Sequence, residues 1–176
     1  MRMRYTPSNI PALKERTVFF DANAIIYIFW PITPDSQESI DYGSILATLL
    51  RNNLSLAINE SVISEIHNRI LKLEFKKTGL PKEKFKNYRD SDDGISVQSD
   101  LNAIIKDKIL TNFQIINEPL SKDDLLSILN VTKLDFNDKL IELLCKKKNM
   151  ILLTHDSDFS SSDVDILTAN SALRKR

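Results

Sequence analysis

The chain has 176 residues, and its 24 Lys and Arg residues balance 24 Asp and Glu residues, so its formal net charge at neutral pH is zero. This length suits one domain with a sizeable core, and the balanced charge gives no overall field that would attract nucleic acid or a membrane. A single cysteine and only three glycines exclude an internal disulfide and the glycine-rich loops that cradle nucleotide phosphates.

The N-terminal stretch MRMRYTPSNIPALKER is basic but lacks the apolar run of a secretory signal. The longest apolar run, AIIYIFWPI, is too short to span a bilayer and contains Pro31. The lone Cys145 suits a reducing compartment. The sequence therefore predicts a cytoplasmic protein without a membrane segment.

Short apolar runs alternate with longer stretches of helical spacing along the rest of the chain. The runs predict strands, and the longer stretches predict helices that separate them. Such alternation is typical of an α/β fold, so we expect a central, mostly parallel five-stranded sheet with helices on both faces. The expected strands are 17–20, 54–59, 114–116, 150–154 and 164–168, and the expected helices are 36–53, 60–75, 121–129 and 136–148.

Residues 76–99 are the least regular part of this pattern. Gly79-Leu80-Pro81 ends the preceding helix, and Asp90 to Gly94 forms an acidic, turn-rich patch. The segment is too short to fold alone. We therefore expect a single domain over 1–176, with an insertion or mobile flap at 76–99.

Asp21 directly follows the first apolar run, and Asn23 lies two residues further on. One interpretation is a helix cap, in which the Asp21 carboxylate accepts backbone N–H groups of the following helix. The other is a ligand-binding acid at the carboxyl end of a central strand, where open α/β sheets place their sites. This stretch alone does not decide between them.

The run ILLTHDSDF repeats the pattern, because Asp156 follows an apolar strand and Asp158 lies two residues later. If the two strands are neighbours at a switch point of the sheet, Asp21 and Asp156 face each other across one crevice. Two buried strands that both end in an acid make a shared site more plausible than two separate caps.

Two further acids are expected at the same edge of the sheet: Glu65, about one turn into a helix, and Asp138, in the first turn of another. Each also has a structural explanation, because acids are favourable near helix N-termini. The acids Asp135, Glu60 and Glu142 are explained without a site, as a helix cap, a first-turn acid and an i, i+4 partner of Lys146, respectively.

Carboxylates that converge in a poorly solvated cleft repel one another unless a cation neutralises them. Mg²⁺ or Mn²⁺ fits best, because hard cations prefer oxygen ligands and also hold phosphate oxygens. Zinc fits poorly, since His67 and His155 have no ligand-like spacing with the single cysteine. A site of this kind would promote hydrolysis of a phosphodiester.

The blocks VFFDANAII, INESVISEI, DFNDKLIELL and ILLTHDSDF resemble, in this order, the four acidic motifs of PIN-domain nucleases. The resemblance implies a PIN-like domain with Mg²⁺- or Mn²⁺-dependent endoribonuclease activity. It places the family's catalytic, metal-binding acids on Asp21, Glu65, Asp138 and Asp156, with Asn23, Thr154 and Asp158 in support. Members frequently form homodimers, and many small ones are VapC-like toxins held inactive by a cognate antitoxin, so these partners are implied as well.

An RNA substrate would have to be bound by a local patch. The densest basic segment alternates with Phe75, Phe85 and Tyr88, a pattern that suits backbone contacts and base stacking. A solvated amphipathic helix with its aromatics in the core explains it equally well. The candidate RNA-binding residues are Lys76, Lys77, Lys84, Lys86 and Arg89.

Other functions remain as alternatives. An aspartyl-phosphate phosphotransferase normally has a second Asp two residues after the first, where this chain has Asn23. A phospho-receiver needs a lysine after a late strand, and LLTHD offers none. A non-catalytic RNA-binding or scaffold module would not need all four acids.

Overall fold

The computed structural model describes residues 2–13 and 15–174, which form one six-stranded sheet with every strand pairing parallel. The strand order is β1-β6-β5-β2-β3-β4. The strands are β1 (Arg4–Tyr5), β2 (Val18–Phe20), β3 (Leu56–Ile58), β4 (Gln114–Ile115), β5 (Ile151–Leu153) and β6 (Asp165–Leu167). The α/β prediction is confirmed, but the expected count of five strands is wrong, because β1 adds a sixth beside β6.

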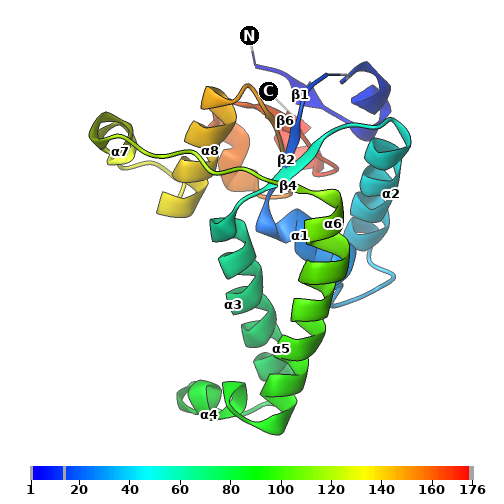
Figure 1. Ribbon diagram of the computed structural model, residues 1–176, viewed down its shortest axis with the longest axis vertical. Helices are drawn as coiled ribbons and strands as arrows, with labels where there is room; N and C mark the ends of the chain where they lie inside the picture. Colours follow the sequence, from blue (N-terminus) through cyan, green and yellow to red (C-terminus); the bar gives the residue numbers. More distant parts are fainter. Residues whose placement is uncertain (1, 14, 175–176) are drawn as a thin grey trace.

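Helices cover the sheet on both sides, with α8 on one side and α2 on the other (Figure 1). Among the described residues no helix combines the length and the apolarity needed to cross a membrane. The α-helices are α1 (Ala22–Phe29), α2 (Gln37–Arg51), α3 (Glu60–Lys77), α4 (Phe85–Arg89), α5 (Asp92–Ile104), α6 (Leu110–Asn112), α7 (Lys122–Ile128), α8 (Phe136–Lys147) and α9 (Ser171–Arg174). Short 3-10 helices lie at η1 (Pro7–Ala12), η2 (Lys82–Lys84) and η4 (Ser157–Ser161), and a π-helical turn at η3 (Ile105–Ile109) joins α5 to α6.

The central strands β2, β3 and β5 have three residues each. Every residue of β2, β3 and β5 is buried. Strands covered by helices on both faces have no solvent-facing side, so their sequences are continuously apolar rather than alternating. Beyond the end of β2, the first buried polar side chain is that of Asp21.

The order of the strands creates a switch point between β2 and β5. After β2 the chain moves outward to β3 and β4, and it then returns to pair β5 with the other edge of β2. Phe20 is in register with Leu153, so both strands end at the same level. Open α/β sheets bind their ligands where the chain direction reverses in this way. Asp21 and Thr154 therefore begin the two loops that border such a crevice.

Residues 76–99 differ from the irregular segment that the sequence predicts, because most of them are helical. Helices α3 and α5 run side by side and project away from the sheet, with α4 at the far end (Figure 1). Helices α3, α4 and α5 are called the arm below. At its tip Phe75 packs against the rings of Phe85 and Tyr88, with 5.4 Å between ring centroids in each pair. Gly94 lets α5 start close to α4, since a Cβ atom there would lie 2.1 Å from the carbonyl oxygen of Tyr88.

Candidate functional site

Asp21 is both the cap of a helix and a buried acid. It is the N-cap of α1, and its Oδ1 accepts the N–H of Ala22 at 2.6 Å. Its Oδ2 accepts the hydroxyl of Thr154, across the switch point, at 2.7 Å. Only 4% of the residue is exposed, and burial is the main cause that raises its pKa to about 6. The cap interpretation is thus correct, and it does not compete with a role in a site.

The turn after β5 is organised around the hydroxyl of Thr154. This hydroxyl donates to Asp21 and accepts the backbone N–H of Asp156 at 3.0 Å. The side chain of Asn23 accepts the backbone N–H of His155 at 3.1 Å. Asp156 in turn caps η4, because its Oδ1 accepts the N–H of Asp158 at 2.9 Å. The loops that follow β2 and β5 are therefore tied together by side chains from both.

Two residues that the sequence analysis does not identify donate hydrogen bonds to backbone carbonyls of the same turn. The buried Tyr42 on α2 donates its hydroxyl to the carbonyl of Thr154 at 2.8 Å. Asn170, after β6, donates its side-chain N–H to the carbonyl of His155 at 2.7 Å. Tyr42 shares one helix face with Ile45 and Leu49, so a lone phenol in an apolar stripe was the available signal.

Asp138 lies near the other acids rather than facing solvent alone. Asp135 is the N-cap of α8, as the sequence predicts, and its side chain accepts the N–H of Asp138 at 2.9 Å. The pKa of Asp138 is raised to about 7, first by loss of solvent and then by the negative charges of Asp135, Asp21 and Asp156. A helix N-terminus would by itself favour the charged carboxylate. The neighbouring acids and the desolvation outweigh it.

Glu65 on α3 also acts on the buried acid. Its negative charge helps to raise the pKa of Asp21, and the positive charge of Arg69 lowers it. Glu65 and Arg69 are joined by an ion pair of 3.2 Å, one helical turn apart. Arg69 was missed by the sequence reasoning, although its i, i+4 spacing from Glu65 is the pattern of such a pair.

The four acids therefore influence one another, but their side chains do not enclose a common point. Within residues 2–13 and 15–174 no three His, Cys, Asp or Glu side chains are grouped closely enough to hold a metal ion. Asp21 binds Thr154, Glu65 binds Arg69 and Asp156 binds the turn that follows it. The donor set nevertheless fits a hard divalent cation, since it consists of carboxylates whose charges oppose one another. A four-carboxylate metal site remains a prediction.

Three other acids lie outside this group. Glu60 is in the first turn of α3, as predicted. The predicted pair of Glu142 with Lys146 is present at 3.2 Å, but Glu142 is not simply a solvated residue. It also accepts the hydroxyl of Ser162 at 3.0 Å and the N–H of Asp163 at 2.6 Å, so it fastens α8 to the segment after η4. The side chain of Asp158 is exposed.

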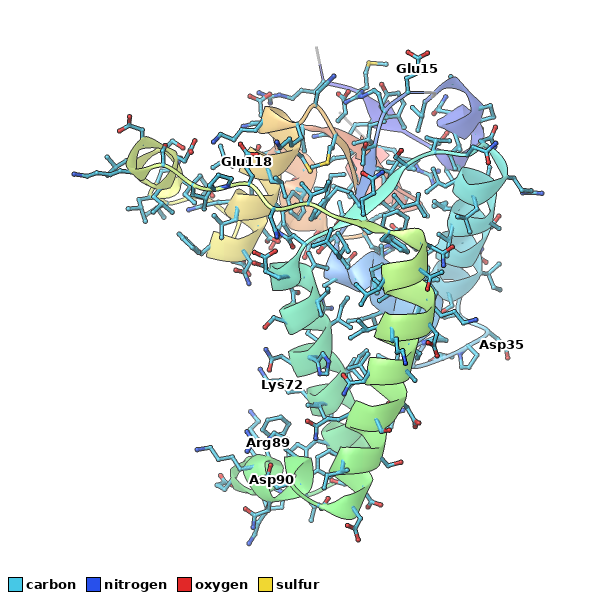
Figure 2. All side chains as sticks on the ribbon, viewed as in Figure 1. Glu15, Asp35, Lys72, Arg89, Asp90 and Glu118 are labelled. Atoms are coloured by element: carbon cyan, nitrogen blue, oxygen red, sulfur yellow. The ribbon has the colours of Figure 1, made fainter. Side chains whose placement is uncertain are left out.

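The basic segment lies along the arm, and two of its three aromatic residues are buried. Phe75 and Tyr88 are each 7% exposed and pack with Phe85, which favours the structural explanation of that pattern. Lys77 pairs with Glu74 at 2.7 Å and Arg89 with Asp90 at 2.7 Å. Figure 2 marks Arg89 and Asp90 at the end of the arm and Lys72 nearer the sheet. The predicted RNA contact of these cations is untested, and base stacking by Phe75 and Tyr88 is wrong.

No protein-family model matches this sequence, and no curated protein sequence does either. Among solved structures, the chain is similar to one in the crystal structure of VapBC2 from Rickettsia felis bound to a DNA fragment from the promoter, with a TM-score of 0.53 and 17% identity. The match covers 88% of this chain and 99% of that one. A chain in the structure of FitAcB from Neisseria gonorrhoeae matches with a TM-score of 0.49 and 17% identity over 85% and 96% of the two chains. The likeness to VapBC2 shows that the fold is PIN-like, as in the VapC toxins.

Proposed function

We propose that the protein is an endoribonuclease that hydrolyses RNA phosphodiester bonds with Mg²⁺ or Mn²⁺ bound by Asp21, Glu65, Asp138 and Asp156. The single observation that carries this proposal is the mutual influence of these acids at the switch point. Glu65 helps to raise the pKa of the buried Asp21, and Asp21 and Asp156 help to raise the pKa of Asp138. Acids with perturbed pKa values in one crevice are typical of functional sites.

A divalent cation in such a site activates water and stabilises the charge that develops on phosphate oxygens. The chain's own residues prepare for it. Thr154 fixes the carboxylate of Asp21 through its hydroxyl and the turn of Asp156 through the backbone. Asn23 holds the same turn at His155. Asp138 is half-buried and lies within the electrostatic influence of Asp135, Asp21 and Asp156, so a bound cation would keep it as the carboxylate.

We propose further that a cognate antitoxin controls this activity and that the protein forms a homodimer. The similar structure from Rickettsia felis is of VapBC2, a toxin–antitoxin pair on promoter DNA. A non-catalytic RNA-binding module is the alternative function. That alternative gives no reason to keep Asp21 and Asp138 together at a cost in electrostatic repulsion.

Cleavage of RNA by the purified chain tests the proposal. We expect endonucleolytic products with Mn²⁺ or Mg²⁺ and none with EDTA. Asp21→Asn, Asp138→Asn and Asp156→Asn should each lower the rate by roughly two orders of magnitude or more, because metal-centred charge stabilisation supplies several kcal/mol.

Glu60→Gln is the matched control, since Glu60 is an acid in the first turn of α3 outside the group. It should leave the rate within about twofold of that of the unmodified protein. Cleavage that persists after exhaustive chelation, or equal losses in Glu60→Gln and Asp138→Asn, would contradict the assignment.

A further inference from the structure

A pocket of about 310 Å³ lies beside the acids, between α1 and α3. Its apolar lining comes from Ile26 and Tyr27 on α1, Ile32 after it, and Leu73 on α3. Ile32 is 52% exposed, so the pocket is open to solvent on that side. The volume is within the usual range for pockets that hold small organic groups.

The polar lining of this pocket is almost entirely cationic. Arg69, Lys72 and Lys76 line it from α3, and their spacing of three, four and seven residues places them on one face of the helix. Throughout the described part of the chain, Lys72 and Lys76 form no ion pair, whereas Lys77, on the next face, is paired with Glu74. Two unpaired ammonium groups beside an apolar wall are available for an anion that also carries an apolar body.

The pocket shares two residues with the candidate site. Asn23 lines the pocket and also holds the turn of His155 and Asp156. Arg69 lines it as well, while its charge acts on Asp21 and its guanidinium pairs with Glu65. A chain bound in the pocket would therefore lie next to the two residues that contact Glu65 and the turn of Asp156.

We infer that this pocket binds the nucleotide next to the scissile phosphodiester of a single-stranded RNA, with its phosphates on Lys72 and Lys76 and its base against Ile26, Ile32 and Leu73. The inference rests on the proposed function for the identity of the adjacent site. The bound nucleotide must be unpaired, because a base must leave its stack to contact an apolar wall. The arm cations further along α3 and α4 then contact only the more distant backbone.

An acidic peptide is the other occupant with matching charge. RNA fits better, because Lys72 and Lys76 stand one helical turn apart on one face of α3 and can contact successive phosphates of a backbone.

The test measures binding and cleavage separately. A labelled single-stranded RNA of about eight nucleotides, within the site sizes of single-strand binders, is titrated in EDTA by fluorescence anisotropy. The double variant Lys72→Gln/Lys76→Gln should bind it roughly tenfold more weakly. The slope of log affinity against log salt should fall by about 1.4, as expected when two contacts to a single-strand backbone are lost. Lys108→Gln on η3, an exposed lysine outside the pocket, is the matched control and should change neither.

A second comparison tests the base contact. An RNA with an abasic nucleotide next to the scissile bond should bind several-fold more weakly than the intact RNA, and Ile32→Ser should remove most of that difference. In Mn²⁺ the double variant should raise KM and leave kcat nearly unchanged, because it removes ground-state binding.

The outcomes separate this inference from the proposed function. If RNA cleavage requires Mn²⁺ but affinity and KM are unchanged in the double variant, the inference about the pocket is wrong and the proposed nuclease activity stands. If no cleavage occurs under any condition but RNA binding depends on Lys72 and Lys76, the proposed nuclease activity is wrong and RNA binding in the pocket stands. Displacement of the RNA by an equal concentration of poly-glutamate would show that the pocket prefers an acidic peptide and would overturn the inference.

Discussion

At Asp138 two electrostatic effects oppose each other within one helical turn. The N-terminus of α8 favours its carboxylate, while partial burial and the charges of Asp135, Asp21 and Asp156 disfavour it. The pKa of about 7 shows that the second effect is larger. The ionised side chain is therefore a local strain on the metal-free protein, and the strain is relieved either by a proton or by a cation.

The strain predicts how stability depends on pH. Because the pKa of Asp138 is raised on folding from 3.8 to about 7, its ionisation lowers the free energy of unfolding as pH rises through this window. Asp138→Asn in EDTA should therefore be more stable than the unmodified protein at pH 8, by on the order of 1–2 kcal/mol after allowance for partial exposure. Below about pH 4 the two proteins should be equally stable.

Chemical denaturation at several pH values measures this difference. The exposed Asp100→Asn on α5 is the control and should not reproduce it. A difference between Asp138→Asn and the unmodified protein that is the same at all pH values would contradict the assignment of Asp138 to a strained site.

Among the secondary-structure elements, α2 has a role that its place in the sequence does not reveal. Its Tyr42 lies 112 residues before Thr154 in the chain, yet its hydroxyl donates to the carbonyl of that residue. Its hydroxyl also lies 3.3 Å from Nδ1 of His155, and the two rings are 5.6 Å apart. Helix α2 thus fixes the turn that carries Asp156, although it contributes no acid.

Tyr42→Phe isolates this contact because it keeps the ring and removes the hydroxyl. The loss of a buried hydrogen bond should cost about 1 kcal/mol of stability. We expect kcat to fall roughly tenfold with KM little changed, since the turn of Asp156 becomes less well held and RNA binding does not depend on it. Thermal denaturation and steady-state cleavage measure the two effects. If the fall in kcat is no larger than the loss of folded protein accounts for, Tyr42 contributes only to packing.

The elements that the sequence predicts best are those whose signal is local. The buried runs that form β2 and β5 and the capping Ser121 of α7 could be read from adjacent residues. Strand β1 could not, because Arg4 and Tyr5 form no apolar run and are a strand only through their pairing with β6. The helices within 76–99 could not be read in this way either, since Ser91, which caps α5 and is followed by two acids, lies in a stretch whose composition indicates a turn.

In the candidate site too, the features with a local sequence signal could be predicted and those that depend on tertiary contacts could not. Asp21 and Asp156 each follow a buried strand, so the approach of their two loops could be predicted from the order of the elements. The contributions of Tyr42, Arg69 and Asn170 depend on which helix packs against which loop. That information resides in the tertiary structure, and no spacing along the chain specifies it.

For the molecule as a whole, the proposed metal should act as a ligand of the folded state. At a Mn²⁺ concentration about a hundred times Kd, binding would stabilise the fold by about 2.7 kcal/mol. For a domain of this size that corresponds to a rise in Tm of roughly 5–10 °C. Asp138→Asn should show a much smaller rise. Calorimetry with EDTA, Ca²⁺ and Mn²⁺ measures the Tm of both proteins. Equal rises in Tm for the unmodified protein and Asp138→Asn would show that the metal binds away from the acids.

In this parallel sheet, residues that lie far apart in the sequence are neighbours in the structure. Asp21 and Thr154 are hydrogen-bonded but 133 residues apart, and β1 pairs only with β6, near the other end of the described chain. At synthesis rates of about 5–20 residues per second, Asp21 exists for roughly 7 to 27 seconds before its partner is made. Until then the switch point has only one side. During synthesis, the proposed RNA-cleaving site of the nascent chain is therefore incomplete. It can assemble only after the ribosome has translated the messenger past the codons of Thr154 and Asp156.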